Sequence, residues 1–227
     1  MKVGSDGLEL IDAYQPNTGG TGKNYISGAA QTFTQYEPGG YHGFTWEPGH
    51  GETWAFECYC KLPPYFRGLD TSWWSTNWDW SDEVDFFESW TTGSPNASEA
   101  LLGTTWIYET NPRRSTESWS SLWQKFDPSA AFHRYTTVIT PNNTIEEYID
   151  GVHLFSFTPP YLAAAPKMGL ILSNALREET GGGGSVDKQF TSGTRTLDIR
   201  SIAVYEDGDH AGQNVEGGGV APGTTVG

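Results

Sequence analysis

The sequence predicts an all-β domain in which two antiparallel sheets pack face to face. Short runs of β-branched and aromatic residues recur along the chain, and turn residues separate them, with 28 Gly and 13 Pro among 227 residues. No segment keeps an apolar period of 3.6 residues, and one helical turn at 127–132 is the most that the pattern allows. Many short strands without helices are typical of a sandwich.

The predicted strands share a richness in Val, Ile, Thr, Tyr, Phe or Trp and end at Gly, Pro, Asn or Asp. They are Thr53–Leu62, Glu83–Trp90, Leu101–Tyr108, Phe132–Ile139, Thr144–Ile149, Val152–Phe157, Met168–Leu172 and Thr196–Tyr205. Asp150–Gly151 predicts a tight hairpin turn between two of them, because glycine tolerates a positive φ.

The charge of the chain argues against two classes of partner. Lys and Arg total 13 and Asp and Glu total 28, which gives a net charge of −15. Such a surface repels phosphate backbones and anionic lipid headgroups, so we expect no nucleic-acid partner. No apolar run approaches the length of about 18 residues that a membrane span needs, and the N-terminus lacks the apolar core of a signal peptide.

Aromatic residues and cysteines give two further expectations. The chain has 10 Trp, 11 Tyr and 11 Phe beside 2 Met, an excess that suits stacking on sugar rings, although aromatic rings buried between two sheets are the alternative. Cys58 and Cys60 would point to the same face of one strand, where a disulfide is strained, so we expect reduced, structural thiols.

An acidic strand, Asp82–Trp90, carries the chemistry. Glu83 and Asp85 share one face because side chains alternate with a period of two. Strict alternation would bury Glu88 in the core, where an unpaired carboxylate costs several kcal/mol. A β-bulge at Phe86–Phe87 would return Glu88 to the face of the other two.

Three carboxylates on one face suit the hydrolysis of glycosides. Like charges at close range force one group to keep its proton. A retaining glycosidase needs a carboxylate nucleophile and a protonated carboxylic acid about 5–5.5 Å apart. Asp85 could orient the nucleophile between the two longer Glu side chains. The alternative is a solvated acidic strand.

The motif and its flanks resemble glycoside hydrolase family 16, the laminarinase, lichenase, agarase and carrageenase group. Glu83–Glu88 matches the family's Glu-x-Asp-x-x-Glu signature. Further similar segments follow in family order over about residues 50–205: Phe56-Glu57, Lys61–Pro63, Gly68-Leu69, Trp73-Trp74, Phe132–Tyr135, Tyr148–Gly151, Leu170–Asn174 and Ile199–Tyr205.

The resemblance implies a concanavalin A-like jelly roll of two curved sheets with a cleft across the concave face. It assigns Glu83 as the nucleophile, Glu88 as the general acid/base and Asp85 as the assisting residue. The chain departs from the family at Tyr59, Trp106 and Ile139, where Arg, His and Trp are common. These changes leave the three carboxylates untouched but alter the expected sugar contacts.

The resemblance also suggests binding residues and a metal. The expected stacking platforms, whose alternative role is core packing, are Trp74, Trp78, Trp80 and Trp106. Asn174 is expected to face the cleft as a hydrogen-bonding residue, and His133 to be structural. No cofactor is required, but Asp198 matches one ligand of a structural Ca²⁺ in the family.

The chain divides into the hydrolase-like domain, residues 1–206, and a Gly-rich tail, residues 207–227. Within the tail, His210–Gly227 resembles the Gly-rich C-terminal ends of minor tail proteins from phages of actinobacteria, which implies possible contacts with neighbouring chains. We therefore expect an extracellular or virion-associated retaining endo-β-glycanase acting on a β-glucan or galactan polysaccharide. The alternative is a virion-attached carbohydrate-binding module on the same fold, which has less use for three like charges in one cleft.

Overall fold

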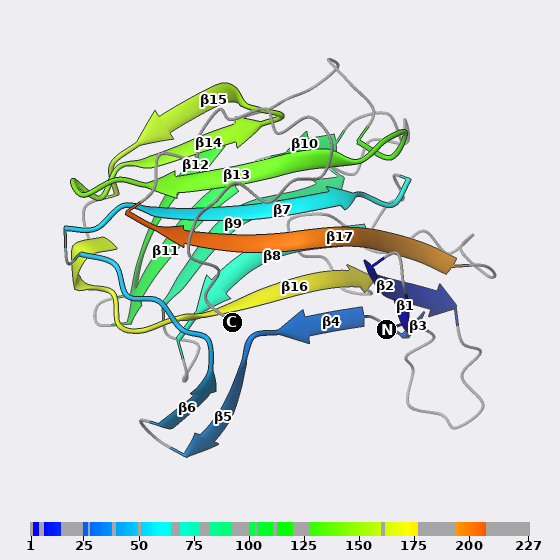
Figure 1. Ribbon diagram of the computed structural model, residues 1–227, viewed down its shortest axis with the longest axis horizontal. Helices are drawn as coiled ribbons and strands as arrows, with labels where there is room; N and C mark the ends of the chain where they lie inside the picture. The colour runs from blue at the N-terminus through cyan, green and yellow to red at the C-terminus, as the bar shows by residue number, and fades with distance from the viewer. Residues whose placement is uncertain are drawn as a thin grey trace.

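A computed structural model shows two antiparallel β-sheets that face each other (Figure 1). It describes residues 2–4, 7–14, 25–26, 28–37, 40–49, 51–64, 69–77, 82–91, 100–102, 104–110, 113–119, 128–159, 162–176 and 194–207. Within these ranges the one helical element is a short 3-10 helix, Leu162–Ala164. In this part of the chain no helix is long and apolar enough to cross a membrane.

The eight-stranded sheet lies in front in Figure 1 and follows the order β1-β2-β17-β7-β13-β14-β15, with β3 beside β2. Its strands are β1 (Lys2–Gly4), β2 (Gly7–Tyr14), β3 (Tyr25–Ile26), β7 (Trp54–Lys61), β13 (His133–Ile139), β14 (Ile145–Ile149), β15 (Val152–Phe157) and β17 (Thr194–Glu206).

The seven-stranded sheet lies behind it and follows the order β12-β11-β9-β8-β16-β4, with β10 beside β9. Its strands are β4 (Gly28–Gln31), β8 (Leu69–Thr76), β9 (Glu83–Thr91), β10 (Ala100–Leu102), β11 (Thr104–Thr110), β12 (Arg113–Trp119) and β16 (Gly169–Leu176). A separate hairpin, β5 (Phe33–Glu37) with β6 (Gly40–Gly43), extends from β4.

Every predicted strand corresponds to a strand of the structure, and the prediction for Val152–Phe157 matches β15 at both ends. The predicted run Leu101–Tyr108 is divided between β10 and β11. The hairpin turn is confirmed, with a φ of 50° at Asp150 and 76° at Gly151. Residues 128–130 form a turn, which is within the limit of one helical turn at 127–132, and residue 127 lies outside the described residues.

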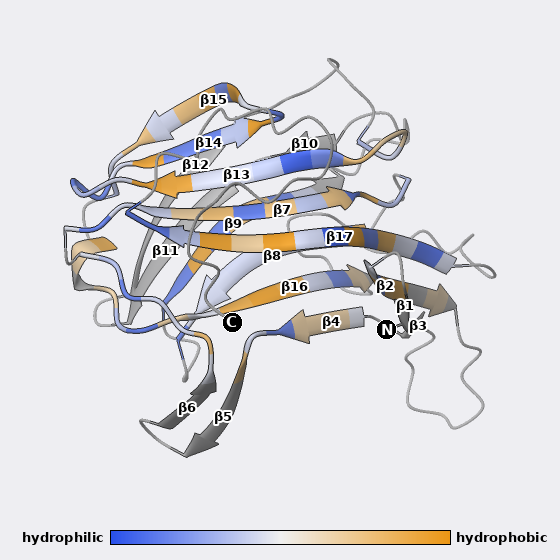
Figure 2. Ribbon diagram, viewed as in Figure 1, coloured by the Kyte–Doolittle hydropathy of each residue, from blue (hydrophilic) through white to orange (hydrophobic). Residues whose placement is uncertain are grey.

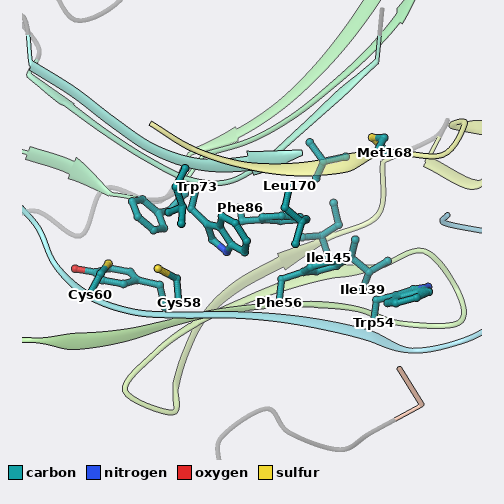
Figure 3. Packing of buried hydrophobic residues seen from close by; sticks show 14 of the residues in the cluster. Trp54, Phe56, Cys58, Cys60, Trp73, Phe86, Ile139, Ile145, Met168 and Leu170 are labelled. Carbon is teal, nitrogen blue, oxygen red and sulfur yellow. The ribbon is translucent and has the colours of Figure 1, made fainter. Parts of the chain in front are cut away.

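Aromatic rings from both sheets fill the space between them (Figure 3). Phe56 of β7 and Phe86 of β9 stack with ring centroids 4.4 Å apart and planes 15° apart. Trp46 packs against Phe56 at 4.7 Å and donates its indole N–H to Ser75 Oγ at 2.7 Å, which satisfies its polar atom inside the core. Much of the aromatic surplus is therefore core.

Cys58 and Cys60 are free and fully buried on the inner face of β7 (Figure 3), as the sequence predicts. Burial raises the pKa of the Cys60 thiol well above its ordinary value, and the hydrogen bond and charge of Cys58 act in the same direction. Both cysteines are thus apolar packing residues.

Candidate functional site

The acidic strand β9 contains the predicted bulge. Three of its residues pair with alternate positions of β8: Glu83 with Thr76, Asp85 with Trp74 and Glu88 with Ser72. The register shifts between Trp74 and Trp73, where Phe86 is the extra residue of β9. Positions opposite each other on neighbouring strands share a face, so Glu83, Asp85 and Glu88 all lie on the same face.

The bulge allows two consecutive aromatic side chains, Phe86 and Phe87, to be buried in the core. Phe86 and Phe87 are 1% and 3% exposed, and both belong to the core cluster. Phe86 stacks on Phe56, while the ring of Phe87 lies 4.7 Å from that of Tyr135. A regular strand would turn one of the two rings outward. The extra residue lets both point inward, and Glu88 then returns to the outer face.

The outer face of the seven-stranded sheet, which is the face turned away from the eight-stranded sheet, is therefore the candidate site. On it, Trp74 is half-buried and its Cα is paired with that of Asp85. Its indole N–H donates to Ser173 Oγ of β16 at 3.2 Å. This bond ties the indole to β16, which flanks β8 on the side opposite to β9.

The three carboxylates differ in their exposure to solvent. Asp85 is 3% exposed, whereas Glu83 and Glu88 are both half-buried. The short Asp side chain thus lies at the base of the face, and the two longer Glu side chains reach further into solvent. A ligand on this face can contact both glutamates.

A fourth carboxylate on this face was not predicted. Asp70 is 5% exposed and accepts a hydrogen bond from Ser72 Oγ at 2.8 Å, and Ser72 is the residue opposite Glu88. Asp70 belongs to β8, which was not among the predicted strands. The signal that could have found it is alternation back from Trp74 through Ser72 to Asp70.

At the other end of β8, a hydrogen-bonded pair closes the loop that leads into β9. Asn77 Nδ2 donates to Asp82 Oδ2 at 3.0 Å, and the Asp82 N–H donates to Asn77 Oδ1 at 3.2 Å. Thr76 Oγ1 also donates to Asp82 O at 2.9 Å. These bonds fix the backbone immediately before Glu83. Trp78 and Trp80 fall between the two residues of the pair and lie outside the described residues.

Phe33 approaches this end of the outer face from the β5–β6 hairpin. It packs so closely on Gly169 of β16 that a Cβ at Gly169 would lie 2.0 Å from the Phe33 ring. Gly169 is paired with Thr76, which is in turn paired with Glu83. Glu83, Thr76 and Gly169 thus lie side by side across three strands, and the buried Phe33 ring covers the Gly169 end. Only glycine at 169 leaves room for this ring.

Asn174 is not on the outer face, and this prediction is wrong. It is paired with Thr71 on the inner face of the sheet and is fully buried. Its Nδ2 donates to Leu10 O at 3.4 Å and to Arg195 O at 3.1 Å, while its Oδ1 accepts from Thr71 Oγ1 at 2.7 Å. The first two bonds reach the opposite sheet, so Asn174 joins the two sheets and cannot contact a sugar. Figure 2 shows β16 becoming polar here after the apolar run Leu170–Leu172.

The remaining predicted residues are only partly tested. Asp198 lies on β17 and forms an ion pair with Lys61, with Oδ2 and Nζ 3.1 Å apart. No group of three His, Cys, Asp or Glu residues that could hold a metal occurs among the described residues, and calcium binding stays a prediction. Trp106 belongs to β11, next to Ile107, whose Cα is paired with that of Val84, but its side chain lies outside the described part. His133 bonds Asp150 through Nδ1 at 2.7 Å.

Comparison with known proteins identifies the fold. No family model and no curated protein sequence matches the chain. Among solved structures, the laminarinase catalytic domain from Thermotoga maritima is similar with a TM-score of 0.64 at 17% identity, covering 88% of this chain and 77% of that one. A mixed-linkage glucan GH16 protein from Bacteroides ovatus, bound to the product G4G4G3G, gives 0.62 at 14% identity, covering 90% and 83%.

A β-agarase A in complex with oligoagarose gives a TM-score of 0.62 at 17% identity, covering 87% of this chain and 72% of the agarase. Identities this low establish the fold and nothing further. The predicted jelly-roll sandwich of two antiparallel sheets is confirmed.

Proposed function

We propose that this protein is a retaining endo-β-glycanase that acts on a β-glucan or galactan polysaccharide. The observation that carries the proposal is the bulge at Phe86, because it brings Glu83, Asp85 and Glu88 to one face. Folded proteins avoid such a group of like charges unless it has a use. Proteins of the same fold named as a laminarinase and an agarase support the substrate class.

In the proposed reaction, Glu88 donates its proton to the glycosidic oxygen while the carboxylate of Glu83 attacks the anomeric carbon. The bond to the leaving sugar breaks, and a covalent glycosyl–Glu83 ester forms. Glu88, now a carboxylate, takes a proton from water, whose oxygen attacks the anomeric carbon and releases Glu83. Two displacements restore the original anomeric configuration.

Asp85 is proposed to assist by holding Glu83 in its reactive rotamer and by separating the pKa values of the two glutamates. Its position between them on β9 and its low exposure support this role. Trp74, whose indole is held by Ser173 on the same outer face, is proposed to stack on a sugar ring.

A reducing-sugar assay with laminarin, lichenan and agarose tests the proposal. We expect release of reducing ends from at least one polymer, and Glu83→Gln should abolish turnover while leaving polysaccharide affinity nearly unchanged. Glu206→Gln, at an exposed position at the end of β17, is the matched control and should retain full activity. Early products followed by ¹H NMR should keep the β configuration; inverted products would mean that water attacks directly.

The rival proposal is a carbohydrate-binding module without catalysis. It predicts affinity for a polysaccharide, no release of reducing ends, and no greater effect of Glu83→Gln than of an exposed control. Attachment to a virion is supported only by the resemblance of the tail sequence, and it is compatible with either function. Co-purification of the chain with a particle, lost on deletion of the tail, is the observation that would establish it.

A further inference from the structure

Two polar residues face each other inside the apolar core. Thr137 of β13 and Glu147 of β14 are cross-strand partners and are 2% and 5% exposed. Thr137 Oγ1 and Glu147 Oε2 lie 2.8 Å apart. Their neighbours on the same face, Tyr135, Ile139 and Ile145, all belong to the core cluster. Burying such a pair costs free energy that apolar residues would not cost, which calls for a reason for its presence.

The reason lies across the core, at the bulge. Thr137 Oγ1 is also 3.5 Å from the carbonyl oxygen of Phe86, the extra residue of β9. A bulge takes its extra residue out of the regular ladder of backbone hydrogen bonds, so the peptide there needs other contacts to keep its position.

The opposite sheet contacts Phe86 at two points. Thr137 is paired with Phe56 in the register of β13 and β7. The Phe56 ring stacks on the Phe86 ring at 4.4 Å, as Figure 3 shows, while Thr137 reaches the Phe86 carbonyl. Neighbouring residues of one sheet thus hold both the ring and the backbone of the bulge residue.

We propose that Thr137, held in place by Glu147, is a positioning residue that anchors the bulge and thereby orients Glu88. Glu88 is two residues beyond Phe86, and its place on the outer face depends on the bulge. The consequence for catalysis rests on the proposed function; the anchoring of β9 does not. The Thr137 hydroxyl has one proton, which Oγ1 donates to Glu147 Oε2 at 2.8 Å and shares with Phe86 O at 3.5 Å, so the bond to Phe86 O is the weaker of the two. The bond to Phe86 O strengthens when Glu147 donates to Oγ1 instead, which a carboxylic acid or an amide can do.

Thr137→Val replaces the hydroxyl by a methyl group of similar size, and Thr136→Val is its matched control. Thr136 precedes Thr137 in β13 and is equally buried at 4% exposed, but it is paired with Glu57 on the other face of the sheet. Two readouts are compared: kcat and KM on the best polysaccharide, and hydrogen–deuterium exchange of peptides that cover 83–91.

We expect Thr137→Val to lower kcat about tenfold at unchanged KM and to speed amide exchange in 83–91 about tenfold, since one buried hydrogen bond is lost. Thr136→Val should leave both readouts near those of the wild type. Equal effects of the two variants, or a lower Tm without change in either readout, would overturn the proposal and make Thr137 an ordinary core residue.

Two further comparisons keep the test decisive if Thr137→Val does not fold. Thr137→Ser and Thr137→Ala differ only in the hydroxyl oxygen, and only the Ser variant should retain slow exchange in 83–91. Glu147→Gln can donate to Thr137 Oγ1 and should retain slow exchange as well. If the wild type hydrolyses no polymer, the proposed function fails, but the exchange data still decide whether Thr137 anchors the bulge.

Discussion

Replacing Asn174 by Ala should destabilise the protein without changing kcat of the proposed reaction. The side chain is fully buried and makes three hydrogen bonds, and in two of them its Nδ2 donates to backbone carbonyls of the opposite sheet, Leu10 O and Arg195 O. The third ties it to Thr71 within its own sheet. Alanine would leave all three partners without this bond and open a small void between the sheets.

The size of the effect follows from these bonds. A net contribution of about 1 kcal/mol for each hydrogen bond, with a further penalty for buried groups left unsatisfied, gives a loss of roughly 2–4 kcal/mol in the free energy of unfolding. Because folded domains are stable by only about 5–15 kcal/mol, this is a large fraction. For a chain of this size the Tm should fall by roughly 5–15 °C.

Urea unfolding followed by tryptophan fluorescence measures the loss, and kcat measured well below the Tm gives the catalytic readout. Ser173→Ala is the neighbouring control, because Ser173 lies half-buried on the outer face and bonds only the Trp74 indole among described contacts. It should cost less than about 1 kcal/mol of stability. An Asn174→Ala variant with wild-type stability and weakened polysaccharide binding would refute the reasoning and return Asn174 to the sugar site.

Three further outcomes are expected. Burial raises the pKa of Tyr205 above its ordinary value of 10.0, with Glu57 acting in the same direction and Arg134 opposing it. As the pH rises, Tyr205 therefore ionises first in the unfolded chain, so its contribution to the free energy of unfolding is complete below about pH 10 and is lost at higher pH. Tyr205→Phe should reduce the decrease of the unfolding free energy above about pH 10. Calcium at Asp198 has to compete with the Lys61 ammonium for the carboxylate. Millimolar calcium should raise the Tm of the wild type, raise it more in Lys61→Gln and leave it unchanged in Asp198→Asn. An unchanged Tm in the wild type would contradict the calcium site. The Asp207 N–H donates to Thr53 O at 2.7 Å and Asp207 Oδ1 accepts from the Thr53 N–H, so a truncated chain should keep Asp207. Deleting 208–227 should leave folding and the proposed hydrolysis intact, and loss of either would mean that the tail is part of the sandwich.

The strands that the sequence revealed are those whose apolar residues alternate or cluster. Three strands of the seven-stranded sheet were missed, β4, β8 and β12, and all three lack this signal. β8 reads Leu-Asp-Thr-Ser-Trp-Trp-Ser-Thr and is buried on both faces largely through small hydroxyl residues. β12 reads Arg-Arg-Ser-Thr-Glu-Ser-Trp, without apolar alternation. β8 is placed by its pairing with β9 and β16, and β12 by its pairing with β11, and not by an apolar alternation of their own.

The sequence predicts which face of the sheet a residue lies on only where neighbouring apolar side chains must be buried. Phe86 and Phe87 are adjacent rings that both need burial, and this forces a bulge that can be inferred from six residues of sequence. Asn174 and Ser173 give no such local signal, because both side chains are small and polar and either could be buried or exposed. Their faces depend on the register of β16 against β8, and a shift of one residue exchanges them.

The same distinction explains why the candidate site divides into a predicted and an unpredicted half. Glu83, Asp85 and Glu88 lie on one strand, so a local rule placed them together. Asp70 and Ser72 reach the same face from β8 through register alone, while Thr137 approaches the bulge from the other sheet, 51 residues along the chain from Phe86. Because these groups come from separate strands, a change in the pairing of β8 or β13 alters the surroundings of Glu88 without any change in the acidic strand. The surroundings of the proposed catalytic glutamate can therefore vary within this fold while the three carboxylates stay in place.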